Sequence, residues 1–239
     1  MLMTRMLSGA QGLTYAQTVL QDKPVAFWQL NDTSGTVALD SSGNGYSATY
    51  EGSPTLGAAP IANGLGKSAS LSAASSQYVT LAAPPAALQL VEGSFEGWWK
   101  PSVLPTAANT GGAILATHYS GGDINYMLGF SANDGTGSGS TIDFSRYGGS
   151  WQDTVGPQAV VNTPYHVVGT FDGTTSRLYV NGALAASASG TTFTPTANAI
   201  LMGMGDNGGY LTGLLSNVAI YNTVLSAARI LAHYNAGIA

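Results

Sequence analysis

The chain has 239 residues, and only 8% of them are charged, against about 25% in an average domain. The net charge is −5 and the seven Lys and Arg residues are scattered, which disfavours nucleic acid and anionic membranes as partners. There is no cysteine, so disulfides, thiolate zinc sites and cysteine nucleophiles are excluded.

The first residues carry no signal for export. Residues 1–14 lack the continuous apolar run of a signal peptide, and no segment approaches the ~20 apolar residues of a membrane helix. We expect residues 1–14 to be a flexible or docking arm and residues 15–239 to form one domain. An exterior wetted mainly by Ser, Thr, Asn and Gln is typical of secreted or virion-borne β proteins.

Short apolar runs separated by turn residues recur along the chain. After a turn of helix or an extended segment at Tyr15–Leu20, strands are predicted at residues 24–30, 47–50, 69–71, 78–81, 93–101, 113–117, 126–130, 141–146 and 158–161. Phe27 or Trp28 should point inward from the first of them. A hairpin follows, with strands at His166–Phe171 and Arg177–Val180. The last strands are predicted at residues 199–202 and 213–221. This spacing favours an all-β sandwich.

One short helix is predicted near the C-terminus, at residues 225–234. It begins with Ser226 as N-cap, is rich in alanine, and is followed by Gly237 as a stop. Its apolar face should comprise Ile230, Leu231 and Tyr234.

Six runs occur in a fixed order along the chain: AFWQLND (26–32), DSSGNG (40–45), SFEGWWKP (94–101), YHVVGTFDG (165–173), LYVNG (178–182) and LSAARI (225–230). Together they resemble the laminin-G-like, concanavalin A-like jelly-roll domains over about residues 15–236. The resemblance implies a two-sheet antiparallel jelly-roll sandwich with six or seven strands in each sheet, and recognition of carbohydrate or protein is the commonest use of that fold.

Calcium is the metal to consider, because it binds six to eight oxygens in irregular loops. Asp40 and Asn44 supply part of such a shell, and Asp32 is near in sequence. The alternative is that Asp40 and Asn44 only cap a turn. Relatives that bind calcium use carboxylates near the first loop and a late strand, but this chain has Ser216–Asn217 where the family usually has Asp-Glu.

We expect no catalytic activity. Glycosidases of this fold commonly present a Glu-x-Asp-x-x-Glu run, which is absent, and the chain has no Gly-x-Ser-x-Gly elbow. Glu96 is predicted to lie on the solvent face or rim beside Trp98 and Trp99. The three histidines are predicted to be isolated, and His166 should have a structural role.

Aromatic residues near polar groups are the better functional lead, since sugar rings stack on Tyr or Trp. Two sets are predicted on loops that meet at one end of the sandwich: Tyr119, Asp123, Asn125 and Tyr126, and Arg146, Tyr147, Trp151 and Asp153. The alternative is that these aromatics complete the core or a subunit contact.

Two functions remain open from the sequence. One is a non-catalytic, lectin-like module on a virion or extracellular surface (tail, spike or capsid decoration) that binds a glycan or host-cell surface. The other is a structural decoration or assembly protein that contacts other virion subunits or forms a homo-oligomer. The last predicted helix ends close to the chain's end, so we expect no attached catalytic domain.

Overall fold

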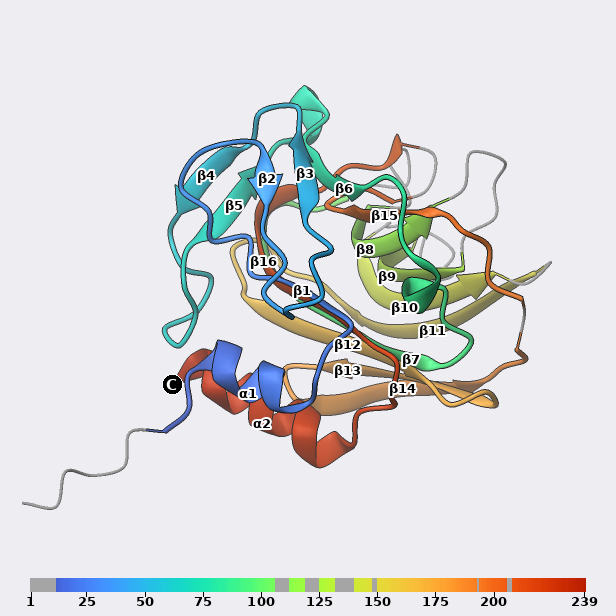
Figure 1. Ribbon diagram of the computed structural model, residues 1–239. Coiled ribbons are helices and arrows are strands. Elements are labelled where there is room, and N and C mark those ends of the chain that lie inside the picture. The colour runs from blue at the N-terminus through green and yellow to red at the C-terminus, as the bar shows by residue number, and fades with distance from the viewer. Residues whose placement is uncertain are drawn as a thin grey trace, which may run out of the picture.

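The computed structural model describes residues 12–105, 112–118, 125–131, 140–147, 150–192, 194–205 and 208–239. These residues form two antiparallel sheets and two α-helices (Figure 1). The predicted all-β sandwich with a C-terminal helix is confirmed. Most of the predicted arm, residues 1–11, lies outside the described residues, and Thr14 is the N-cap of the first helix.

The first sheet is built around β16, which pairs with β7, β5 and β1. Its strands run in the order β14 (Ala183–Ser189), β13 (Thr175–Val180), β12 (Tyr165–Phe171), β7 (Gly93–Val103), β16 (Thr212–Tyr221), β5 (Ser68–Leu71) and β4 (Thr55–Ala58), with β1 (Ala26–Trp28) also on β16.

The second sheet contains the strands that lead to the predicted aromatic sets. Its order is β11 (Trp151–Gln158), β10 (Thr141–Tyr147), β9 (Tyr126–Ser131), β8 (Ala113–His118), β15 (Ala199–Met202), β6 (Tyr78–Leu81), β3 (Ala48–Glu51) and β2 (Val37–Ala38). Two 3-10 turns, η1 (Ala73–Ser75) and η2 (Ala86–Leu88), lie in the connections. Each sheet has eight strands among the described residues, slightly more than the six or seven that the resemblance implied.

The main core lies between the two sheets. Because side chains alternate along a strand, β7 directs Phe95 and Trp99 into this core and Trp98 to the opposite side. The first strand divides in the same way: Trp28 enters the core between the sheets and Phe27 faces away from it. Both rings are fully buried, so the run at 24–30 supplies both hydrophobic layers.

A second core covers the outer face of the first sheet. It joins Phe27, Trp98 and Val168 to residues of α1 (Tyr15–Gln21) and α2 (Ala227–Ile238). Figure 1 shows the two helices side by side against this sheet. The central strands of the first sheet are therefore buried on both faces. Among the described residues, neither helix is long and apolar enough to cross a membrane.

The C-terminal helix differs from its prediction in extent and in its buried face. Ser226 is the N-cap, as expected, but the helix continues through Gly237 to Ile238. A Cβ at position 237 would lie 2.3 Å from the Trp98 ring, so only glycine fits there. Leu231 is 46% exposed, whereas Ile230 and His233 are buried. The glycine is a close-packing residue of the helix and not its stop.

Several strands were misplaced or missed. The strand predicted at residues 158–161 is β11, Trp151–Gln158. Its Pro157 is tolerated because β11 lies at the edge of its sheet. β2, β4 and β14 were not predicted: β2 has two residues, and β14 is a largely exposed, alanine-rich edge strand without a clear apolar pattern.

The predicted hairpin is confirmed as β12 and β13. Its turn is stabilised by Asp172, whose Oδ1 accepts hydrogen bonds from the backbone N–H groups of Thr174 (3.1 Å) and Thr175 (2.8 Å). Leu178 enters the main core and Tyr179 the second core.

Tyr179→Ala should lower the free energy of unfolding by about 3 kcal/mol or more, because the ring is only 6% exposed. The matched control is Leu184→Ala, since Leu184 pairs with Tyr179 across β13 and β14 but is 57% exposed. Urea unfolding of the two variants measures the difference, and equal stabilities would contradict the placement of Tyr179 in the core.

Candidate functional site

One face of the β10–β11 hairpin combines aromatic and acidic side chains. Tyr147 pairs with Trp151 and Ser145 with Asp153 across the two strands. Directly paired residues point to the same side of a sheet. Phe144 points into the core between the sheets. The set of Tyr147, Trp151, Ser145 and Asp153 therefore lies on the outer face of the second sheet; we call it the aromatic face.

The two rings of the aromatic face form an edge-to-face pair. Their centroids are 5.3 Å apart at an angle of 62°, and Trp151 is 37% exposed. Beside them, the Ser145 hydroxyl donates to Oδ2 of Asp143 (2.8 Å). Asp153 is partly exposed, whereas Asp143 is fully buried. The face thus offers a ring surface next to one accessible carboxylate.

Arg146 is not part of this face, contrary to the prediction. It follows Phe144 by two residues and therefore points inward, where its guanidinium carbon lies 3.3 Å from the centroid of the Phe171 ring. Its Nε donates to Ser176 (3.0 Å) and its Nη2 to Gln152 (2.7 Å). Burial lowers the pKa of Arg146 to about 10, so it stays charged at neutral pH. The alternation of Ile142 and Phe144 was the sequence signal for this orientation.

The other predicted set is only partly described. Tyr119 and Asp123 lie outside the described residues. Asn125 is buried, where its amide donates to the carbonyl of Thr196 (2.9 Å). Tyr126 is also buried, and its hydroxyl donates to a main-chain carbonyl of the loop before β7.

These two residues therefore hold loops together and are not surface contacts. Tyr126 pairs with Arg146, however, so the two predicted sets do adjoin at one end of the second sheet.

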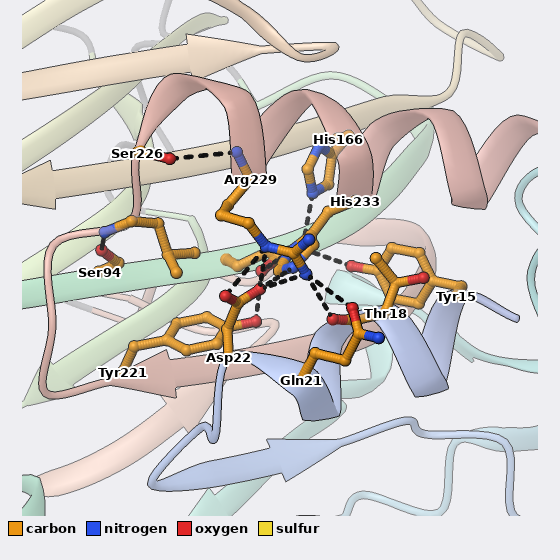
Figure 2. A network of polar contacts seen from close by, with 12 residues as sticks. Tyr15, Thr18, Gln21, Asp22, Ser94, His166, Tyr221, Ser226, Arg229 and His233 are labelled. Carbon is orange, nitrogen blue, oxygen red and sulfur yellow. Dashed lines mark hydrogen bonds and ion pairs between the residues drawn. The ribbon is translucent and has the colours of Figure 1, made fainter. Parts of the chain in front are cut away.

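The strongest polar network lies in the second core and centres on Glu96 of β7 (Figure 2). Its Oε1 accepts hydrogen bonds from Tyr15 (2.5 Å) and from Nε2 of His166 (2.8 Å). Its Oε2 accepts from Tyr221 (2.7 Å) and from Nδ1 of His233 (3.0 Å). One carboxylate thus connects both helices to three strands of the first sheet.

The network continues to the surface through Asp22, directly after α1. His233 donates through Nε2 to Oδ2 of Asp22 (2.7 Å), and Arg229 pairs with the same oxygen (2.8 Å). Figure 2 shows these side chains converging between the two helices. Since both ring nitrogens of His233 face carboxylates, both carry protons and the ring is an imidazolium.

The pKa shifts follow from this arrangement. Burial alone would raise the pKa of Glu96, but His233 and His166 outweigh it and hold that pKa well below its usual value. Burial would lower the pKa of His233, whereas Glu96 and Asp22 raise it. Burial, reinforced by Glu96, raises the pKa of Tyr15 well above 10, so this hydroxyl remains a donor.

This network corrects two predictions. Glu96 is 0% exposed and not at the rim, and His166 and His233 are not isolated, because both bind Glu96. His166 has the structural role that was expected. No substrate reaches Glu96, so the network holds the helices on the sheet. The strand alternation from Phe95 to Trp98 indicated which side of β7 Glu96 faces. Nothing near Glu96 in the sequence indicated its partners, because all of them are distant along the chain.

The Asp40 loop does not fit a calcium ion. Oδ1 of Asp40 accepts from the N–H groups of Phe27 (3.0 Å) and Ser42 (2.9 Å), and Oδ2 accepts from the Ser42 hydroxyl (2.8 Å) and the N–H of Tyr46 (2.9 Å). Asn44 donates to the main-chain carbonyl of Val25, directly before β1 (2.9 Å).

Asp32 accepts from the Tyr50 hydroxyl (2.8 Å) and so stands apart from the loop. Within the described ranges, no group of three or more His, Asp or Glu side chains is arranged to hold a metal. The geometry supports the turn-capping alternative for Asp40 and Asn44.

Residues 72–231 match the family model described as "Concanavalin A-like lectin/glucanases superfamily". This region is more than half of the chain. The chain belongs to the concanavalin A-like lectin/glucanase superfamily. The resemblance inferred from the six motifs is thereby confirmed at the level of the family. A comparison with curated proteins gave no match.

Solved structures share the fold of this superfamily member at low sequence identity. Domain 4 of AbnA, a GH43 extracellular arabinanase from Geobacillus stearothermophilus in complex with arabinotriose, is 20% identical, with a TM-score of 0.65 over 88% of this chain and 98% of that one. The receptor binding domain of botulinum neurotoxin mosaic serotype C/D is 17% identical, with a TM-score of 0.68 over 90% of this chain.

The binding domain of botulinum neurotoxin DC in complex with SialylT is 15% identical, with a TM-score of 0.65 over 91% of this chain. This superfamily domain spans about half of the two toxin domains, 51% and 52%.

Calcium should not stabilise the domain, because the Asp40 carboxylate already accepts four hydrogen bonds. We expect the same Tm in excess calcium and in excess chelator, measured by scanning calorimetry. A calcium-dependent rise in Tm that disappears in Asp40→Asn would contradict this assignment.

The Glu96 network should make stability depend on pH from both sides. Glu96, with its lowered pKa, stabilises the fold above about pH 4.5, and this contribution is lost as the pH falls through that lowered pKa. His233, with its raised pKa, contributes fully below about pH 6.5 and loses its contribution as the pH rises through that raised pKa. Stability should therefore be greatest between about pH 4.5 and 6.5.

The variant His233→Gln tests the alkaline side of this dependence. Its free energy of unfolding should be lower than that of the wild type at pH 6 and should fall less steeply above pH 6.5. Asp172→Asn is the control, since the Asp172–Arg177 pair is partly exposed and shares no residue with the Glu96 network. Equal slopes in the wild type and His233→Gln would show that His233 is not the titrating group.

Proposed function

We infer that this protein is a non-catalytic, lectin-like module that binds a glycan on the aromatic face. The observation that carries the proposal is the Tyr147–Trp151 pair beside Asp153 on the outer face of a sheet. A sugar ring presents C–H groups to an aromatic ring and hydroxyls to a carboxylate, and these are the groups that this face offers.

The comparisons support carbohydrate as the ligand class. The family includes lectins, and two of the similar structures are complexes with arabinotriose and with SialylT. The buried position of Glu96 supports the non-catalytic part of the proposal, because a glycosidase needs two carboxyl groups that reach one glycosidic bond. On the aromatic face, Asp143 is fully buried, so Asp153 is the carboxylate that faces solvent.

The setting that we propose is a virion or other extracellular surface. It is supported by the low charge, which suits an exterior wetted by hydroxyl and amide groups. Contacts with other virion subunits and contacts between copies of this chain remain predictions from the sequence. Light scattering of the purified protein measures its oligomeric state and so tests the contacts between copies.

Trp151→Ala should weaken glycan binding by about tenfold or more, because exposed tryptophans at binding surfaces often carry much of the affinity. A glycan array identifies the ligand, and titration calorimetry then compares the variants. Tyr78→Ala is the matched control: Tyr78 also forms a surface aromatic pair, with Tyr210, at a ring separation of 5.9 Å, but it lies on β6.

Three results would contradict the proposal. One is an array without saturable binding, and another is equal affinity of the wild type and Trp151→Ala. The third is hydrolysis of the bound glycan that is lost in Asp153→Asn, which would make the aromatic face an active site.

A further inference from the structure

A cavity opens at the end of the sandwich where β1 and β7 begin and β16 ends. Its volume is about 650 Å³, and it lies between the end of α1, the Asp40 loop, the η2 region and Asn222. The register joins these elements, because Ala26 pairs with Ile220 and Ser94 with Tyr221. The cavity is lined by none of the residues of the aromatic face or the Glu96 network.

Three polar side chains that line this cavity have no partner within the described residues, whereas the Ser42 hydroxyl already donates to Asp40 (2.8 Å). Lys23 forms no ion pair there, and neither the Tyr46 hydroxyl nor the Asn222 amide forms a hydrogen bond. Asn44 uses its amide nitrogen to donate to the carbonyl of Val25 (2.9 Å), which leaves its Oδ1 open. A cation, a hydroxyl and two amide groups therefore line one space, and no carboxylate lines it.

The remaining wall is apolar and includes Val25 and Leu90. An apolar surface with a few converging polar groups is the usual composition of a small-molecule site. The single ammonium matches a ligand with one negative charge, whereas phosphate sites commonly provide several N–H donors or an arginine fork. The amide and phenol groups suit hydrogen bonds to the hydroxyl groups of a ligand, and the apolar wall suits contact with the C–H face of a sugar ring.

Lys23 has a backbone conformation that glycine would adopt more easily. It follows Asp22, the C-cap of α1, with a φ of 52°, and its N–H bonds to the carbonyl of Leu20 (3.2 Å). This left-handed position after a helix is usually glycine, and it is also the residue before Pro24, which restricts it further. Ending the helix explains the conformation but not the lysine, because glycine would adopt this conformation with less strain.

We propose that this cavity binds a monosaccharide unit that bears a carboxylate, with Lys23 pairing with the carboxylate. Asn44, Tyr46 and Asn222 bind the sugar hydroxyls. The site is separate from the aromatic face and does not depend on the function proposed for it.

Titration calorimetry of the full chain at low ionic strength tests this site with glucuronate, galacturonate and N-acetylneuraminate. Glucose is the neutral control, and acetate is the carboxylate without a ring. At least one of the three acids should bind with a Kd below about 1 mM. Glucose and acetate should bind about tenfold more weakly or not at all, because each lacks one of the two recognised groups.

Two substitutions at one position separate binding from folding. Lys23→Gly should lose about tenfold or more in affinity while the protein unfolds at the same or a higher temperature, because glycine relieves the left-handed strain. Lys23→Gln should lose a similar factor through removal of the charge alone. Lys67→Gln, which removes an exposed lysine elsewhere, and Trp151→Ala should bind the acid as the wild type does.

The proposal is overturned if none of the three acids binds, if Lys23→Gln binds them as tightly as the wild type, or if acetate binds as tightly as the acidic sugars. Acid binding that is lost in Trp151→Ala but kept in Lys23→Gln would move the recognition of acidic sugars to the aromatic face. Loss of neutral glycan binding in Trp151→Ala tests only the aromatic face, so the two proposals fail independently.

Discussion

The arrangement of this protein depends on one enclosed negative charge, that of Glu96. A carboxylate without solvent is costly unless hydrogen bonds and opposite charges surround it. Here two tyrosine hydroxyls and two imidazoles occupy both of its oxygens. These donors come from α1, β12, β16 and α2, so the charge is stabilised only when both helices lie on the sheet. The network therefore specifies where the helices dock, in addition to any stability that it supplies.

The consequence is a division between the two faces of the sandwich. The outer face of the first sheet is closed by a second hydrophobic core, in which Trp98 packs against Gly237 of α2. The outer face of the second sheet instead carries Tyr147, Trp151 and Asp153 near one edge. The binding sites that we propose therefore lie on the second sheet and at the end of the sandwich, while the helices mainly close the outer face of the first sheet.

Much of the fold was predictable because its signals are local. Alternating apolar residues and the turn at Asp172 identified β12 and β13, and Ser226 marked the start of α2. The candidate site was predictable only in part. Tyr147, Trp151 and Asp153 were identified by residue type, but they were placed on a loop, whereas the structure has them on paired strands. Arg146 and Tyr126 were assigned to the surface although strand alternation directs both inward.

The sequence by itself determined the fold class, the positions of most strands along the chain, the central hairpin and the superfamily, because these depend on patterns within short stretches of chain. Only the tertiary structure decided that Glu96, His166 and His233 meet, since their positions are 70 and 137 residues apart from Glu96 along the chain. It likewise decided that Asp40 is saturated by its own turn together with Phe27 of β1, and that Lys23 and Asn222 line one cavity. Contacts between distant residues arise from sheet pairing and helix docking, which no local pattern encodes.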